Sequence, residues 1–102
     1  MSVEQLLREA IAGRRLIRFT FDGLVRVAEP HDYGSLKGTD RVLVYQVGGK
    51  SRSGRLPDWR LVGVEKMVGI EVLEQTFPGP RESSTGRRYH WDQLYASVFQ
   101  EG

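Results

Sequence analysis

The feature that most constrains the fold is an Asp22-Gly23 dipeptide between two short runs of alternating apolar and polar residues. Apolar side chains occupy every second position of residues 17–21 before the dipeptide and of residues 25–27 after it. Such alternation is typical of a strand with one buried face, and Asp-Gly is favoured in two-residue hairpin turns. The sequence therefore predicts an antiparallel hairpin over residues 16–29, which Pro30 ends.

Three further apolar runs follow, and no helical crossover separates them. Residues 41–47, 59–64 and 69–73 are rich in β-branched and other apolar residues and predict three more strands. Residues 31–40 and 48–55 carry glycine, serine and charged residues and predict loops. Five strands without a crossover helix predict a mainly β fold, a small five-stranded barrel, because five strands are about the minimum that closes.

Both ends of the chain show helical periodicity. From Val3 to Ile11 apolar residues recur at i, i+3, i+4, i+7 and i+8, Ser2 and Gln5 form a capping-box pattern, and Gly13 stands at the expected left-handed end. The same spacing predicts a second amphipathic helix near the C-terminus, with an aromatic stripe made of Trp91, Leu94, Tyr95, Val98 and Phe99. We expect this helix to cover the open end of the barrel, and the alternative is an anchor for a partner protein.

A chain of 102 residues has room for one domain. Within it we expect the helix and barrel over residues 1–77, a loop or linker over 78–90 and the packed C-terminal helix over 91–99. The chain has no cysteine, which excludes disulfides, thiolate zinc sites, iron–sulfur clusters and a cysteine nucleophile, and favours the reducing cytoplasm. No export signal or long apolar run is present, so we expect no membrane contact.

The basic residues concentrate in one stretch. From Lys37 to Arg60 the chain holds six cations against two carboxylates, with Tyr45 and Trp59 interleaved. Guanidinium groups for phosphates and aromatic faces for bases are what a nucleotide or single-stranded nucleic-acid site needs. The candidate ligand-binding residues are Arg41, Tyr45, Lys50, Arg52, Arg55, Trp59 and Arg60. The plain alternative is a solvated basic loop with the two aromatic residues in the core.

The sequence contains no motif for phosphate binding by a glycine-rich loop, for metal binding or for nucleophilic catalysis. Residues 48–51 (Gly-Gly-Lys-Ser) lack the spacing of a phosphate-binding loop that opens a helix. His31 and His90 lie far apart without metal-ligand spacing and are expected in loops, and no nucleophile-elbow motif is present. We expect no enzyme, no cofactor and no metal.

Several segments, taken in order, resemble the WYL domain, a bacterial Sm-like or SH3-like barrel usually found downstream of a DNA-binding helix-turn-helix. They are the opening Ala10–Gly23, the dipeptide Glu29-Pro30, the run Trp59-Arg60-Leu61 and the run Glu71–Phe77. The resemblance covers most of residues 6–77. It implies that Arg60 belongs to a polar cluster that holds a nucleotide or single-stranded nucleic acid.

This chain departs from the family at two places. The tripeptide that names the family would fall near Arg41-Val42-Leu43, where only the leucine remains, and the second arginine of the strand-four motif is Gly63. We expect no helix-turn-helix ahead of Ser2. The sequence thus predicts a divergent, stand-alone, non-enzymatic module that binds a nucleotide or short single strand. The alternative is an assembly module that contacts itself or a protein partner through strand edges or the aromatic C-terminal helix.

Overall fold

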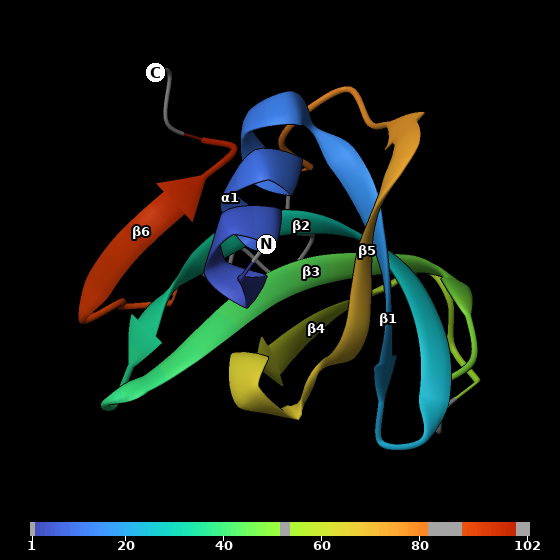
Figure 1. The fold of residues 1–102 in the computed structure, drawn as a ribbon, viewed down its shortest axis with the longest axis horizontal. Coiled ribbons are helices and arrows are strands. Elements are labelled where there is room, and N and C mark those ends of the chain that lie inside the picture. The colour runs from blue at the N-terminus through green and yellow to red at the C-terminus, as the bar shows by residue number, and fades with distance from the viewer. Residues whose placement is uncertain (1, 52–53, 82–88, 100–102) are drawn as a thin grey trace.

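The computed structural model describes residues 2–51, 54–81 and 89–99 of the chain. These residues form one six-stranded antiparallel sheet and one α-helix (Figure 1). Within these ranges no helix has both the length and the apolar character needed to cross a membrane. In chain order the elements are α1 (Val3–Gly13), β1 (Arg15–Phe21), β2 (Leu24–Leu36), β3 (Thr39–Gly49), β4 (Asp58–Gly63), the 3-10 helix η1 (Val64–Lys66), β5 (Val68–Thr76) and β6 (Gln93–Ser97).

The N-terminal helix begins as its sequence predicts. The Ser2 hydroxyl accepts a hydrogen bond from the Gln5 backbone N–H, and the Gln5 side-chain oxygen accepts one from the Ser2 backbone N–H. The left-handed residue at the C-terminal end is Arg14 (φ 51°), one position after the expected Gly13. The Arg14 Nη1 donates a hydrogen bond to the Pro78 carbonyl at 3.0 Å, and this bond connects the end of α1 to a segment that is distant in the sequence.

The expected five-stranded barrel is wrong, because the sheet has six strands and stays open. Five strands follow the order β4-β3-β2-β1-β5, and β6 pairs with β2 off this path. Among the described residues, the end strands β4 and β5 do not pair with each other. Closure requires the first and last strands to share a ladder. Here the chain leaves β4 through η1 and returns as β5 beside β1 instead (Figure 1).

The second strand continues far beyond Pro30, so the expected loop over residues 31–40 is also wrong. Pro30 lies at an irregularity of the β2–β3 ladder, where the register shifts between Pro30 and Asp32 and His31 is the extra residue. A bulge tolerates proline because the ladder is already interrupted there. The strand then runs to Leu36, and Lys37 and Gly38 turn the chain into β3.

The C-terminal segment is a strand, and the expected helix over residues 91–99 is wrong. β6 pairs with residues 32–35 of β2, beyond the part of β2 that pairs with β1. The backbone N–H and C=O groups of this part of β2 form inter-strand hydrogen bonds with the segment. Such tertiary contacts can override the helical preference that the local spacing of apolar residues indicates. Of the aromatic residues in this segment, Tyr95 packs against the buried Tyr33 with ring centroids 5.0 Å apart, whereas Phe99 is 45% exposed.

The main core lies between α1 and one face of the curved sheet. On β3 the buried positions are Val42, Val44 and Gln46, whereas Leu43 and Tyr45 point to the opposite face and are half-buried. The apolar residues that fill the core come from α1, all of the first four strands and the segments after them, and include Leu7, Ala10, Ile11, Ile17, Phe19, Ala28, Val42, Val44, Val62, Met67 and Phe77. The sheet therefore has a core face and an outer face, which separates the candidate functional residues.

Candidate functional site

The structure divides the predicted ligand-binding residues between the two faces of the sheet. Directly opposed residues of an antiparallel pair share a face. Tyr45 opposes Trp59, and Arg41 opposes Gly63, so Arg41, Tyr45 and Trp59 lie on the outer face. Arg60 opposes the buried Val44 and therefore lies on the core face. The described residues of this set therefore do not all share one face of the sheet.

Arg60 organises the loop between β3 and β4. Its Nη2 donates to the Ser51 hydroxyl at 3.0 Å and to the Arg55 carbonyl at 3.5 Å, and its Nη1 lies 3.6 Å from an Asp58 carboxylate oxygen. Three points of the loop and its flanks thus converge on one guanidinium. Arg52 lies outside the described residues.

The start of the same loop is fixed by a buried glutamine. The Gln46 side-chain amide donates to the carbonyls of Gly48 and Lys50, each at 3.0 Å, and its oxygen accepts from Nη1 of the buried Arg26 at 3.2 Å. The Lys50 backbone N–H donates to the Val25 carbonyl at 2.8 Å. The backbone at Lys50 is therefore held in place, while the Lys50 and Arg55 side chains are exposed.

Tyr45 and Trp59 form an aromatic pair on the outer face, immediately before this loop. Their ring centroids lie 5.1 Å apart with an interplanar angle of 63°. The next pair along the hairpin, Gln46 and Asp58, is the last before the loop. The half-buried aromatic pair and the exposed Lys50 and Arg55 thus belong to the same hairpin, the pair in its strands and the cations in its loop. Arg41 lies farther along the same face, and no described residue accepts a hydrogen bond from its buried Nε.

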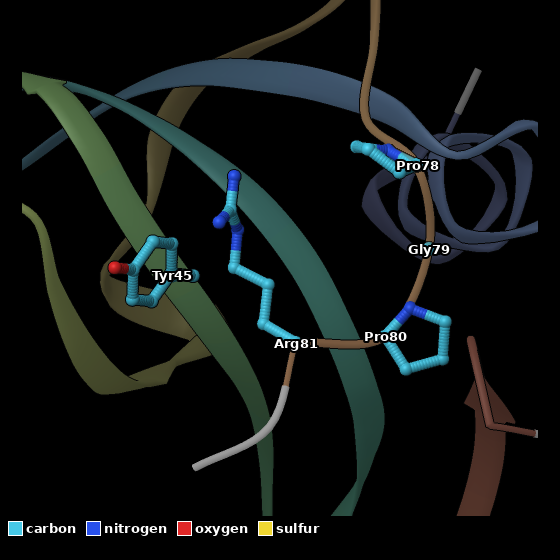
Figure 2. Close-up of a pocket in the computed structure, with 5 residues that line it drawn as sticks. All are labelled: Tyr45, Pro78, Gly79, Pro80 and Arg81. Atoms are coloured by element: carbon cyan, nitrogen blue, oxygen red, sulfur yellow. The ribbon is translucent and has the colours of Figure 1, made fainter. Parts of the chain in front are cut away.

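A segment from a distant part of the chain crosses the outer face beside Tyr45. We call residues 77–81 (Phe77-Pro78-Gly79-Pro80-Arg81) the strap. Figure 2 shows Arg81 extended next to Tyr45, with Pro78, Gly79 and Pro80 following the backbone away from it. Tyr45 and these four strap residues line an open pocket of about 350 Å³.

Arg81 is held by a buried carboxylate and an aromatic ring. Its Nε and Nη2 donate to the two carboxylate oxygens of Glu29 at 2.6 and 2.9 Å, and its Cζ lies 4.7 Å from the centre of the Tyr45 ring. The Glu29 side chain is 4% exposed and that of Arg81 is 43% exposed. The hydrogen bonds that Arg81 donates to the Glu29 carboxylate raise the pKa of Arg81. A two-point contact of this kind fixes the orientation of the guanidinium.

His31, expected in a loop, is completely buried beneath the strap. Its ring lies 4.7 Å from the Trp59 ring and stacks on Phe77 at 5.3 Å. The Arg81 backbone N–H donates to Nε2 at 3.3 Å, so the proton is assigned to Nδ1, which donates to the Glu29 carbonyl at 2.9 Å. Burial lowers the pKa of His31 below its usual value of 6.5, against the raising effect of that backbone hydrogen bond.

The sequence did not indicate Glu29, His31 and Arg81 as one cluster. Glu29 and His31 flank Pro30, which read as the end of a strand, and Arg81 belongs to a segment rich in proline and glycine. Arg81 pairs with Glu29 across 52 positions of the chain. The one local signal in the sequence is Glu29, a carboxylate two positions after Val27 in the alternating strand pattern. A carboxylate buried at such a position requires a partner for its charge.

Residues 2–51, 54–81 and 89–99, which the structure describes, hold no group of three or more histidine, aspartate or glutamate side chains placed to bind a metal ion. The comparisons with known proteins give no further assignment. No protein-family model, curated protein or solved structure matches this chain.

Proposed function

We propose that this protein is a non-enzymatic binding module for a nucleotide or a short single-stranded nucleic acid. The observation that carries the proposal is the Tyr45–Trp59 pair beside a loop whose Lys50 and Arg55 side chains are exposed. An aromatic face stacks on any base, and such stacking contributes about 1–3 kcal/mol per base. The loop cations would neutralise the adjoining phosphates.

Arg60 serves this proposal as a positioning residue. It lies on the core face, and its contacts with Ser51, the Arg55 carbonyl and Asp58 hold the loop. The sequence resemblance to the WYL domain supports the same class of ligand, and membership of that family is part of the proposal. We infer a module of the cytoplasm, because the chain has no cysteine.

The test is fluorescence anisotropy of labelled single-stranded DNA and RNA oligomers at about 50 and 200 mM salt. We expect saturable binding that weakens at the higher salt, because phosphate contacts release counterions. Replacing both Lys50 and Arg55 by Gln should weaken binding and reduce the salt dependence. The matched control replaces Arg18 and Lys66 by Gln, which also removes two positive charges from exposed side chains; the surface ion pair of Arg18 with Glu71 contributes little to stability.

Three outcomes decide between the alternatives. Competition by an unlabelled mononucleotide would identify a nucleotide as sufficient, and its absence would require a strand. An equal loss of affinity in the two-charge control and in the loop variant would mean that only net charge matters. Binding too weak to saturate at about 50 mM salt would contradict the proposal.

Assembly through a strand edge is a second candidate, favoured by two exposed valines. Val68 of β5 and Val25 of β2 are 64% and 48% exposed, and both oppose Thr20 of β1 on the same face of the sheet. β5 also ends the sheet. Sedimentation over a range of concentrations tests this candidate: association that Val68→Lys abolishes supports it, and a monomer at all concentrations contradicts it.

A further inference from the structure

The Arg81 contacts amount to a complete binding site for a guanidinium group. Glu29 supplies two carboxylate oxygens at 2.6 and 2.9 Å, and the Tyr45 ring supplies an aromatic face 4.7 Å from Cζ. A planar fork matches a carboxylate and stacks on a ring in a way that an ammonium group does not. The site therefore selects arginine over lysine.

The two halves of this site differ in how firmly the fold holds them. Glu29 and Tyr45 lie on adjacent central strands and oppose each other in the β2–β3 ladder. Arg81 comes from the strap, where Pro78 and Pro80 have no backbone N–H to join a ladder. The strap backbone is nevertheless tied to the fold at three points: the Phe77 N–H donates to the Arg14 carbonyl at 2.9 Å, the Pro78 carbonyl accepts from Arg14 Nη1 at 3.0 Å, and the Arg81 N–H donates to His31 Nε2 at 3.3 Å. Exchange at the site therefore requires only that the Arg81 side chain, which is 43% exposed, leave the buried Glu29 carboxylate while the strap backbone stays in place.

The space beside the site is open to an incoming group. The pocket of about 350 Å³ is lined by Tyr45 and by the strap residues themselves, including Arg81 (Figure 2). An occupant of the pocket would therefore contact both the ring that holds Arg81 and the backbone that carries it.

We infer that Glu29 and Tyr45 form a receptor site for the arginine side chain of a peptide, and that Arg81 is the resident occupant with which that arginine competes. The partner is an extended, cationic peptide segment, and the strap sequence Pro-Gly-Pro-Arg is itself an example of one. Because Arg81 is tethered, its effective concentration at the site is on the order of millimolar or more. The intact protein is therefore expected to bind such a peptide weakly.

The probes are a labelled Gly-Pro-Arg-Gly peptide and its Gly-Pro-Lys-Gly counterpart, titrated into the wild-type protein and into Arg81→Ala. We expect Arg81→Ala to bind the arginine peptide about tenfold or more tightly than the wild type does, because the resident competitor is gone. The lysine peptide should bind Arg81→Ala at least about tenfold less tightly than the arginine peptide. Adding Glu29→Gln to Arg81→Ala should abolish the preference.

Arg81→Ala leaves a buried carboxylate without its partner, so its fold is checked by circular dichroism, with Arg81→Gln as a second variant. Should both unfold, the wild type is titrated with the arginine peptide while the Tyr45 ring resonances are followed by NMR. Shifts that saturate support the proposal. Wild-type protein that shows no binding up to about 10 mM peptide would make Arg81 a fixed structural contact and would overturn the proposal. Equal binding of the arginine and lysine peptides would also overturn it.

This inference goes beyond nucleic-acid binding and can fail separately from it. Both ligands would use the Tyr45 ring, but the peptide is a cation that also needs the Glu29 carboxylate, whereas a nucleic acid is an anion that also needs Lys50 and Arg55. Glu29→Gln is expected to remove peptide binding and to leave oligonucleotide binding in place. The Lys50 and Arg55 variant is expected to do the reverse.

Discussion

At the scale of single residues, the missing side chain of Gly34 determines how the C-terminal strand docks. A Cβ at this position would lie 2.3 Å from the Gln93 carbonyl oxygen and 2.9 Å from Cε3 of the Trp91 ring. The backbone oxygen belongs to the β6 ladder and cannot yield without breaking it. β6 can therefore pair with β2 because residue 34 is glycine.

Gly34→Ala is expected to destabilise the protein by about 1–3 kcal/mol, the usual cost of overpacking a filled site. Chemical denaturation followed by Trp fluorescence measures the change. Gly48→Ala is the matched control, because it lies in β3 with ordinary φ and its Cβ would come no closer than 3.6 Å to Val27. Equal stability of Gly34→Ala and the wild type would show that β6 does not need this close approach.

The buried His31 makes stability depend on pH with a defined sign. Burial lowers its pKa in the folded protein below 6.5, so as the pH falls the unfolded chain binds the proton first. The stabilising contribution is present above pH 6.5 and is lost as the pH decreases below it. Protonation of His31 would also place a hydrogen on Nε2, which could then no longer accept the hydrogen bond from the Arg81 backbone N–H.

We expect the urea concentration at the unfolding midpoint to decrease when the pH is lowered from about 7.5 to about 5.5. The decrease should be smaller in His31→Gln than in the wild type. His90 is exposed, so His90→Gln is the matched control and should keep the wild-type dependence. An identical slope in His31→Gln and the wild type would assign the pH dependence to other groups.

At the scale of elements, the two hairpins show what the sequence could and could not reveal. Asp22-Gly23 and Lys37-Gly38 both have positive φ at each central residue, as a type I′ turn requires. The Asp-Gly dipeptide is typical of that turn, so the sequence predicts the first hairpin. Lys-Gly is not typical of it, because lysine rarely adopts the left-handed region, and the loop expected over residues 31–40 is in fact the end of a long hairpin.

Lys37→Asn is expected to stabilise the protein by about 0.5–1 kcal/mol, because asparagine adopts the left-handed conformation at a lower cost than lysine does. The lysine side chain is exposed, so little packing changes. Thermal denaturation monitored by circular dichroism is the measurement. A lower melting temperature would contradict the assignment of strain to Lys37.

The C-terminal strand shows the limit of periodicity. Trp91, Leu94, Tyr95, Val98 and Phe99 have helical spacing, yet residues 93–97 form β6. The conformation of this segment depends on its tertiary contacts, because β2 provides a strand edge for pairing and Gly34 leaves room for Trp91. By contrast, α1 carried its own capping signals and was predicted almost to the residue.

At the scale of the whole molecule, the division between core face and outer face governs the candidate site. The basic stretch and the aromatic pair could be found from sequence, because they are local in the chain. Their distribution between faces could not, because strand register places Arg60 opposite Val44 and Tyr45 opposite Trp59. The Glu29–Arg81 pair depends on a contact between segments 52 positions apart, which no local pattern reports.

The most direct test of the central proposal is the fluorescence of Trp59 during titration with an unlabelled single-stranded oligonucleotide, in a Trp91→Phe background. If a base stacks at the Tyr45–Trp59 pair, the emission of Trp59 is quenched to saturation. Tyr45→Leu then requires about tenfold more oligonucleotide, whereas Tyr45→Phe, which keeps the aromatic face, does not. Emission that stays constant while the oligonucleotide binds would place the ligand elsewhere and contradict the account.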